Sequence, residues 1–299
     1  MLFLPVDYDE PLFRPPAEAY SAILQVSLGC SWNKCAFCEM YTTKKYKIRP
    51  LMEIEKDIEG LFSYYPRIKR FFLADGDAMS LDFKPLKDVL DSINRNAEKR
   101  NYRLQRVASY ALPKNIISKS DSELKELRDA DLKLLYVGIE TGDDELLSLI
   151  KKGETYKSTV EGIQKAHNAG IDTSIMIITG LGGRKYSEQH ARNSARIISE
   201  LNPKYLSTLT LSFPLGYDIF RSKFRGEYIP QTTKELFEEL YLFISLLDVE
   251  NVIFRSNHVS NKVSPEGTLS KDKDKILNML SKVIADTPFN EMPKNSRYL

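Results

Sequence analysis

Short apolar segments typical of buried strands alternate with amphipathic helical segments along most of the chain. The segments with strand character are residues 22–28, 70–74, 104–110, 134–140, 171–180, 205–213 and 251–256. Each of the first six is followed by a segment whose apolar residues recur every three or four positions, as one face of a helix requires. Six strand–helix units and one further strand therefore predict a parallel sheet covered by helices.

Particular residues define the predicted helices. Ile54, Ile58, Leu61 and Tyr65 fall on one face of the first helix, and Ser120 is placed to cap the start of a later one. Two arrangements fit this alternation of strands and helices: an open doubly wound sheet, or a complete or partial barrel.

Composition limits the class of protein. Apolar residues make up 42% of the 299 positions, and the formal net charge is only +2. This balance argues against a surface that tracks nucleic-acid phosphates, although the basic run at 44–49 leaves a local patch open. The first residues do not form a signal peptide, and no apolar run reaches the ~18 residues of a membrane span. We expect a soluble, cytoplasmic protein whose thiols stay reduced.

Polar or glycine-rich residues follow most of the predicted strands. The loops are "ADGDA" at 74–78, Ser109 and Tyr110, "GIETGDD" with Glu140, "TGLGGR" at 179–184 and "SNH" at 256–258. Turns favour Gly, Asp and Ser for backbone reasons alone, so each loop separately has an ordinary explanation. In a barrel, however, the loops after the strands meet at one rim, where the chemistry occurs.

The cysteines are the most specific chemical signal. Cys30, Cys35 and Cys38 lie within nine residues directly after the first predicted strand, and the remainder of the chain contains no cysteine. A disulfide would leave one thiol unpaired, and a zinc site would need a fourth ligand from far away, since the nearest histidine is His167. An iron–sulfur cluster held by three thiolates would leave one iron open for a substrate or cofactor.

The strand–loop placement, the three cysteines and the aromatic residue in "AFC" resemble the radical S-adenosylmethionine (radical SAM) superfamily. Four residues separate Cys30 from Cys35, whereas the commonest family spacing has three. The resemblance implies a partial (β/α)6 TIM-like barrel with a C-terminal extension, in the α/β class. It also implies a 4Fe–4S cluster on Cys30, Cys35 and Cys38. The cluster would cleave S-adenosylmethionine reductively to a 5′-deoxyadenosyl radical, which abstracts hydrogen from a substrate.

The resemblance further implies which residues bind S-adenosylmethionine. The stretch Asp75, Gly76 and Asp77 matches the family's glycine-rich motif at the methionine amine, with Asp77 as the acidic contact. The other implied contacts are Ser109 for the methionine portion, Glu140 for the ribose hydroxyls, Gly180 and Gly182 for adenine, and Arg49 for the methionine carboxylate.

The resemblance divides the chain into a lead-in at 1–19, a core barrel at 20–215 and an extension at 216–299 that closes the substrate side. In that extension His258 is a candidate for orienting a substrate or transferring a proton, and the alternative is a histidine that caps loop backbone groups. Overall branch features, including this histidine-bearing loop, look like the branch that contains oxygen-independent coproporphyrinogen oxidase.

No cysteines remain for a second cluster, which disfavours sulfur insertion. We expect a small-molecule or peptide substrate and an electron donor such as flavodoxin or ferredoxin. Two alternatives stay open from the sequence. One is a tRNA-modifying enzyme of the same superfamily, and the other is a non-enzymatic iron–sulfur protein for electron transfer or sensing.

Overall fold

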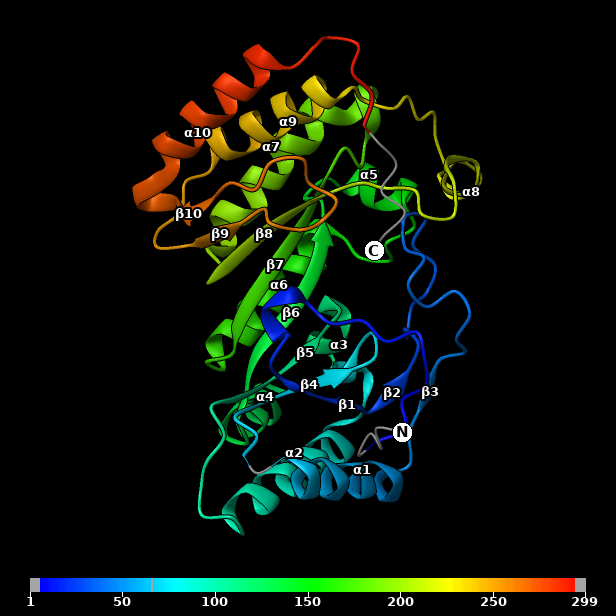
Figure 1. Cartoon of the computed structure of the whole chain (residues 1–299), viewed down its shortest axis with the longest axis vertical. Coiled ribbons are helices and arrows are strands. Elements are labelled where there is room, and N and C mark those ends of the chain that lie inside the picture. Colours follow the sequence, from blue (N-terminus) through cyan, green and yellow to red (C-terminus); the bar gives the residue numbers. More distant parts are fainter. Residues whose placement is uncertain (1–5, 66, 294–299) are drawn as a thin grey trace. The chain divides into compact units, whose positions relative to one another are not determined.

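The computed structural model describes residues 6–65 and 67–293 and has a mixed α/β fold (Figure 1). The 3-10 turns are η1 (Pro16–Glu18) and η2 (Ala78–Ser80). The strands are β1 (Ala22–Gln25), β2 (Ser27–Leu28), β3 (Lys47–Ile48), β4 (Arg70–Ala74), β5 (Arg106–Tyr110), β6 (Leu132–Glu140), β7 (Asp172–Thr179), β8 (Tyr205–Thr210), β9 (Ile253–Arg255) and β10 (Glu266–Thr268). The helices are α1 (Leu51–Tyr64), α2 (Phe83–Glu98), α3 (Pro113–Ile117), α4 (Asp121–Asp129), α5 (Asp144–Leu149), α6 (Tyr156–Asn168), α7 (Gly183–Leu201), α8 (Tyr217–Lys223), α9 (Thr233–Leu246) and α10 (Leu269–Asp286).

The main sheet has the strand order β1-β4-β5-β6-β7-β8-β9-β10, which is also the order along the chain. The pairs from β1 to β6 and from β7 to β9 are parallel, and β10 pairs with β9 in the antiparallel sense. Helices follow β1 and β4 to β8, so the predicted alternation of six strand–helix units and a further strand is confirmed. The predicted class, a mostly parallel α/β fold of the partial TIM-like type, is confirmed as well.

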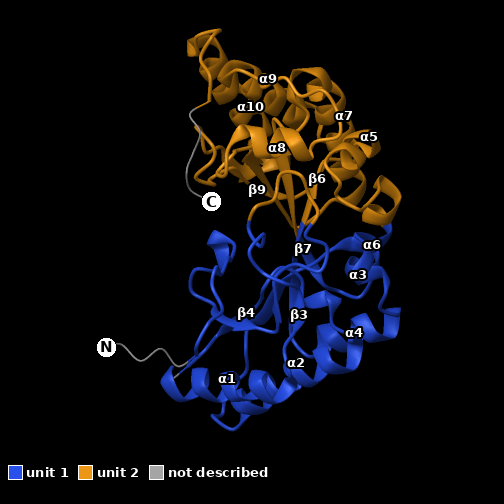
Figure 2. Ribbon diagram, turned by 90° about the vertical axis from the view of Figure 1, so that its right-hand side faces the viewer, with its two compact units in different colours: residues 1–33, 40–137, 161–173 blue, residues 34–39, 138–160, 174–299 orange. Residues whose placement is uncertain are grey.

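The chain forms two compact units, coloured separately in Figure 2. The first unit comprises residues 1–33, 40–137 and 161–173, and the second comprises 34–39, 138–160 and 174–299. In the first unit α1 packs on α2, and Phe71 and Phe72 of β4 are fully buried. In the second unit α9 packs against both α7 and α10, while an apolar cluster that includes Leu147, Ile178 and Phe220 forms part of its core.

Several local predictions are confirmed. Ile54, Ile58 and Leu61 are buried on one face of α1. Ser120 caps α4 through a capping box, in which its hydroxyl accepts from the Glu123 amide while the Glu123 carboxylate accepts from the Ser120 amide. Tyr65 was predicted wrongly to continue the face of α1. It lies beyond the last helical residue in an extended conformation and is exposed, because the chain leaves the helix there.

Two other segments differ from the sequence predictions. The polar stretch 257–268 predicts a loop after the last strand, but it contains β10, because Glu266, Gly267 and Thr268 pair with β9. The apolar spacing at 187–201 predicts a helix that begins near Ser187, but α7 begins four residues earlier, at Gly183. Within the described part of the chain, none of the helices is long and apolar enough to cross a membrane.

A buried carboxylate ties η1 to the sheet of the first unit. Glu18 is fully buried and forms an ion pair with Arg106 of β5. It also accepts hydrogen bonds from Ser21 and, at 2.6 Å, from the Tyr136 hydroxyl of β6. Burial and the neighbouring Glu18 raise the pKa of Tyr136, which therefore stays protonated as the donor. One side chain thus joins three segments that are distant in sequence.

Replacing Glu18 with alanine is expected to destabilise the protein strongly, because Arg106 and Tyr136 would lose their buried acceptor. We expect Glu18→Ala to lower the free energy of unfolding by about 3–5 kcal/mol in urea titrations. Ser120→Ala, which removes one exposed helix cap, should cost only about 1 kcal/mol. Equal losses in the two variants would contradict this account of Glu18.

Candidate cofactor site

The start of the cysteine loop is fixed by a buried carboxylate that follows β4. Asp75 is fully buried, and its Oδ2 accepts from the Gly29 amide at 2.8 Å and from Lys44 Nζ at 2.9 Å. Its Oδ1 accepts from Gln25 Nε2 at 2.8 Å. Asp75 was predicted to bind the cofactor, and the structure shows it bound to protein donors next to Cys30. Its visible role is to hold the loop.

Gly76 lies directly against the first cysteine. A Cβ added at Gly76 would come within 2.9 Å of the Cys30 Cβ and 3.0 Å of the Tyr41 ring. Real Cβ contacts are essentially never that short, so only glycine fits here without displacing Cys30. The Gly76 amide also donates to the Gly29 carbonyl at 3.0 Å. The structure therefore brings the predicted "DGD" stretch and Cys30 together in the first unit.

Asp77 has one oxygen with partners and one without. Its Oδ2 accepts from Ser31 Oγ at 3.0 Å and from the Asn115 side-chain amide of α3. Its Oδ1 is buried and accepts no hydrogen bond of normal geometry from the described residues. Burial raises the pKa of Asp77 to about 6, and the Asn115 and Ser31 side chains and the Leu112 backbone limit that rise. A buried acceptor without a donor is costly unless a ligand supplies the donor.

The other two cysteines lie in the second unit. Between them, the Ala36 amide donates to the Ile150 carbonyl at 2.8 Å, and Ala36 is buried in the apolar cluster of this unit. All three cysteines are partly exposed, and none of them forms a disulfide. Among residues 6–65 and 67–293, no group of three or more His, Cys, Asp or Glu side chains is close enough together to hold a metal ion. The assignment of the cysteines as ligands thus stays a prediction.

A buried ion pair accompanies Cys35 and Cys38. Lys152 Nζ lies 2.7 Å from Glu140 Oε1, and both side chains are less than 10% exposed. Burial lowers the pKa of Lys152, but the charges of Glu140, Cys35 and Cys38 outweigh burial and raise it overall. Glu140 itself has a backbone φ of +65° at the end of β6, a conformation that residues other than glycine rarely adopt. Its predicted partner was a ribose, and its partner within the protein is Lys152.

Ser109 and Arg49 also have protein partners. The Ser109 hydroxyl, at the end of β5, contacts the carbonyls of Leu73 and Tyr110 at 3.2 and 2.8 Å. Arg49 Nη1 donates to the Gln25 carbonyl at 2.9 Å and to Asp57 at 2.6 Å. The predicted cofactor contacts of these two residues remain predictions.

The predicted residues of the C-terminal half lie in the second unit. Gly180 ends β7 with a φ of +86°, and Gly182 caps α7. His258 Nδ1 lies 2.8 Å from the Ser260 hydroxyl and also accepts from the Ser260 amide at 3.2 Å. Burial lowers the pKa of His258. These contacts match the alternative in which the histidine orders its own loop.

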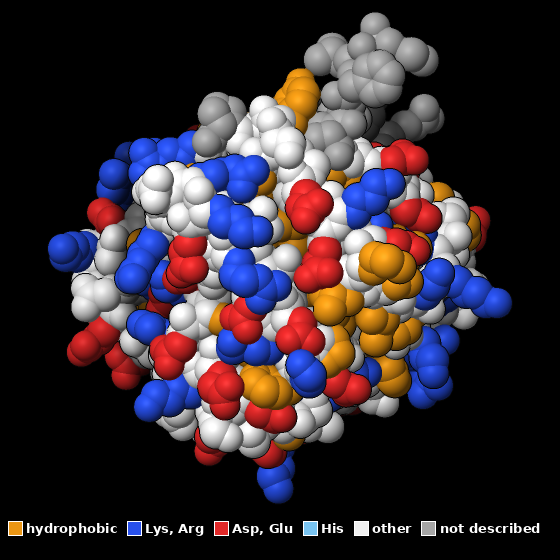
Figure 3. Space-filling model, turned by 90° about the horizontal axis from the view of Figure 1, so that it is seen from below, with side chains coloured by type: hydrophobic (Ala, Val, Ile, Leu, Met, Phe, Trp, Pro, Cys, Tyr) orange, Lys and Arg blue, Asp and Glu red, His pale blue; other side chains and the backbone are white. Residues whose placement is uncertain are grey.

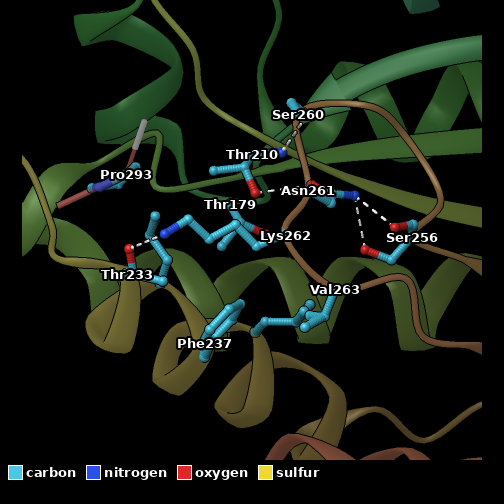
Figure 4. Close-up of a pocket in the computed structure, with 12 residues that line it drawn as sticks. Thr179, Thr210, Thr233, Phe237, Ser256, Ser260, Asn261, Lys262, Val263 and Pro293 are labelled. Atoms are coloured by element: carbon cyan, nitrogen blue, oxygen red, sulfur yellow. Dashed lines mark hydrogen bonds between the residues drawn. The ribbon is translucent and has the colours of Figure 1, made fainter. Parts of the chain in front are cut away.

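A small cavity of about 40 Å³ lies at the carboxyl ends of the strands of the second unit (Figure 4). Thr179 and Thr210 end β7 and β8, and both line it. Asn261 closes one side by donating to the Thr208 and Ser256 carbonyls and accepting from Thr210 Oγ1 at 2.9 Å. Residues of α9 form an apolar wall. In parallel α/β folds this is the end of the sheet where substrates bind.

Sequence analysis missed several residues at the site, among them Ser31, Gln25, Lys44, Asn115 and Lys152. Lys44 was included in a basic run considered for RNA contact, yet it is buried against Asp75. Asn115 follows a proline in a short helix, and Lys152 follows Glu140 by 12 positions. Spacing gives no signal for Lys152, because its partner Glu140 is 12 positions away at the end of β6.

The residues present fit a three-cysteine cluster with S-adenosylmethionine. The donor set is three thiols that form no disulfide, which suits iron, and the close Gly76–Cys30 contact forms a cradle that any other side chain would fill. The buried, unpartnered oxygen of Asp77 is an acceptor suited to an amine. These features agree with the chemistry expected from the cysteine motif.

Comparisons with known proteins show which family the chain resembles. The model of the Radical SAM superfamily matches residues 24–195. The heme chaperone HemW of Bacillus subtilis is 26% identical over 147 residues, covering 49% of this chain and 37% of that protein. A tRNA uridine(34) acetyltransferase of Methanocaldococcus infernus is 19% identical over 275 residues, covering 79% and 51%. The structure of coproporphyrinogen III oxidase HemN from Escherichia coli has a TM-score of 0.57 at 16% identity, covering 75% and 52%.

The chain spans about half the length of these relatives or less, so their substrates do not transfer to it directly. The family match, by contrast, covers more than half of this chain and includes the cysteines, the "DGD" stretch and Glu140. The chain therefore belongs to the radical SAM superfamily and is an enzyme of the class that uses a [4Fe–4S] cluster and S-adenosylmethionine.

Proposed function

We propose that Cys30, Cys35 and Cys38 hold the [4Fe–4S] cluster and that the enzyme acts on a small-molecule or peptide substrate. When bound and reduced, for example by flavodoxin or ferredoxin, the cluster supplies the electron that cleaves S-adenosylmethionine and so starts hydrogen abstraction. The protein's own residues bind the cofactor, orient it and surround it with charge.

The observation that carries this proposal is the pairing of the Gly76–Cys30 contact with the unpartnered oxygen of Asp77. The two residues are adjacent, so an acceptor for an amine lies next to a predicted iron ligand. The methionine amine of the cofactor would donate to Asp77 Oδ1 and satisfy it. Ser31 and Asn115, which bind Oδ2, would keep the carboxylate in place.

Lys152 would contribute a fixed positive charge. Thiolate ligands give a cluster net negative charge, and a buried cation near them favours the reduced state. Lys152 is buried, its charge is felt by Cys35 and Cys38, and Glu140 holds it at 2.7 Å. The Phe37 ring, 5.7 Å from Lys152 Nζ, lies between the two cysteines in sequence.

A small substrate is supported by two features. The cavity at the ends of β7 and β8 is small and lined by hydroxyl, amide and apolar groups. In the basic run at 44–49, Lys44 and Arg49 form internal ion pairs with Asp75 and Asp57, which leaves fewer charges for phosphates. On the face beside α1 and α2, basic and acidic side chains are interspersed (Figure 3).

A tRNA substrate is the second candidate, because the similarity to a tRNA uridine(34) acetyltransferase extends over 275 residues. Binding of tRNA that weakens steeply with added salt would favour this candidate. Binding that is absent at low salt would leave the small-substrate proposal.

One prediction of the proposed function concerns the cluster. The protein reconstituted with iron and sulfide without oxygen should form 5′-deoxyadenosine from S-adenosylmethionine and dithionite, detected by mass. Cys35→Ala should abolish this product, because an iron would lose its thiolate, while Ser264→Ala at an exposed position should keep it. A cluster that forms normally in Cys35→Ala would refute the ligand assignment.

The second prediction concerns the close contact at Gly76. Gly76→Ala places a Cβ 2.9 Å from that of Cys30, so Cys30 must shift. Since overpacking of this kind costs about 1–3 kcal/mol, we expect cluster retention against a chelator to fall roughly tenfold. Gly216→Ala is the control, because its Cβ meets no atom within 4 Å although its φ of +108° is strained. Similar iron loss in both variants would indicate general destabilisation instead.

The third prediction concerns the pH dependence of cofactor binding. Only ionised Asp77 accepts well from an ammonium group, and its pKa is raised to about 6. Affinity for S-adenosylmethionine should therefore fall as the pH decreases through 6. Asp77→Asn should bind weakly without this step, and Asn115→Leu should move the step to higher pH, because the Asn115 hydrogen bond lowers the pKa. Cluster absorbance at each pH controls for loss of iron, and an unchanged step in Asp77→Asn would rule out this role.

A further inference from the structure

The turn between β7 and α7 is held by a carboxylate from α9, which lies outside the residues matched by the family model. Glu239 Oε1 accepts from the Gly180 amide at 2.7 Å. Its Oε2 accepts from Ser187 Oγ at 2.6 Å and from Gln231 Nε2 at 3.1 Å. All these residues belong to the second unit, and the Glu239 side chain is 2% exposed.

The same segment of the extension contacts the turn at other points. The Tyr228 hydroxyl donates to the Gly180 carbonyl at 2.8 Å, so both polar backbone atoms of Gly180 are bound by the extension. The Arg184 amide donates to the Ile229 carbonyl at 2.9 Å. A Cβ at Gly183 would lie 2.5 Å from that carbonyl oxygen, which shows how closely the two segments approach.

Burying the Glu239 carboxylate has a high desolvation free energy for a contact that only stabilises the fold. The three donors to its carboxylate are neutral, and the His190 imidazole lies 3.7 Å away. Burying a carboxylate costs several kcal/mol, which neutral donors offset only when their geometry is good. Burial and the charge of Glu239 raise the pKa of Tyr228, which keeps that hydroxyl protonated and able to donate to Gly180.

We propose that Glu239 is a positioning residue for S-adenosylmethionine. By fixing the Gly180 backbone, it presents a preformed surface to the adenosine half of the cofactor, so little order has to be gained on binding. This inference rests on the proposed function and on the adenine contact that the family resemblance implies for Gly180 and Gly182. It makes the C-terminal extension part of the cofactor site and couples that extension to cofactor affinity.

The test compares the two halves of the cofactor in the reconstituted full chain without oxygen. Glu239→Gln keeps the size of the side chain but loses the charge that strengthens its hydrogen bonds. We expect the Kd for S-adenosylmethionine and for 5′-deoxyadenosine to rise about tenfold, as loss of a charged hydrogen bond implies. Methionine binding, followed by the change it causes in the cluster EPR signal, should be unchanged.

Glu235→Gln is the matched control on the same helix. Glu235 pairs with the partly exposed Arg184 at 2.9 Å and does not contact Gly180, so its affinities should match those of the unmodified protein. If Glu239→Gln fails to fold, Tyr228→Phe removes one hydrogen bond to Gly180 and should weaken 5′-deoxyadenosine binding about threefold to tenfold.

The outcomes separate two failures. Unchanged 5′-deoxyadenosine affinity in folded Glu239→Gln, or equal weakening for methionine, would overturn the role of Glu239 alone. An unmodified protein whose intact cluster binds neither S-adenosylmethionine nor 5′-deoxyadenosine would overturn the proposed function, and this inference with it.

Discussion

The buried Asp75 carboxylate is the contact on which the part of the candidate cofactor site in the first unit depends. It binds the Gly29 amide at the entry to the cysteine loop, and its own position is fixed by the end of β4. Lys44, from the far side of the same loop, neutralises it at 2.9 Å. Because both sides of the loop meet one buried charge, the backbone around Cys30 is defined before any metal is present. Removing Lys44 would leave the buried Asp75 charge with only the neutral Gln25 and Gly29 donors, which is strongly unfavourable.

The order of the strands was predictable because it depends on local patterns. Apolar runs and helical spacing are properties of neighbouring residues, and parallel strands joined by helices have few possible topologies. The ends of elements were less predictable. Tyr65 continues the apolar spacing of α1 but lies outside the helix. β10 lies in a polar stretch without the apolar pattern of a strand, and it forms by pairing with β9.

The residue types of the site were predictable, but their partners were not. Cys30, Gly76 and Asp77 are close together in the structure as the motifs indicated. Asp75 and Arg49, however, were expected to face the cofactor, and both bind protein groups. Such pairs join positions up to 50 residues apart, as Gln25 and Asp75 do. A single sequence contains no signal for a contact of that kind, because either residue alone looks like an ordinary polar residue in a loop.

The charged groups at the site share one physical arrangement. Asp75 with Lys44, and Glu140 with Lys152, are buried acid–base pairs within one unit each, and both lie next to a cysteine segment. A charge held by a buried partner cannot rotate away or be screened by water, so its field at the neighbouring thiols is constant. A constant field suits a cluster whose ability to accept an electron must be fixed in advance. Under the proposed function, these pairs would set the electrostatic environment of the cysteines as well as the fold around them, as the coupling of Lys152 to Cys35 and Cys38 indicates. That role would explain why charges are buried where apolar residues would cost less.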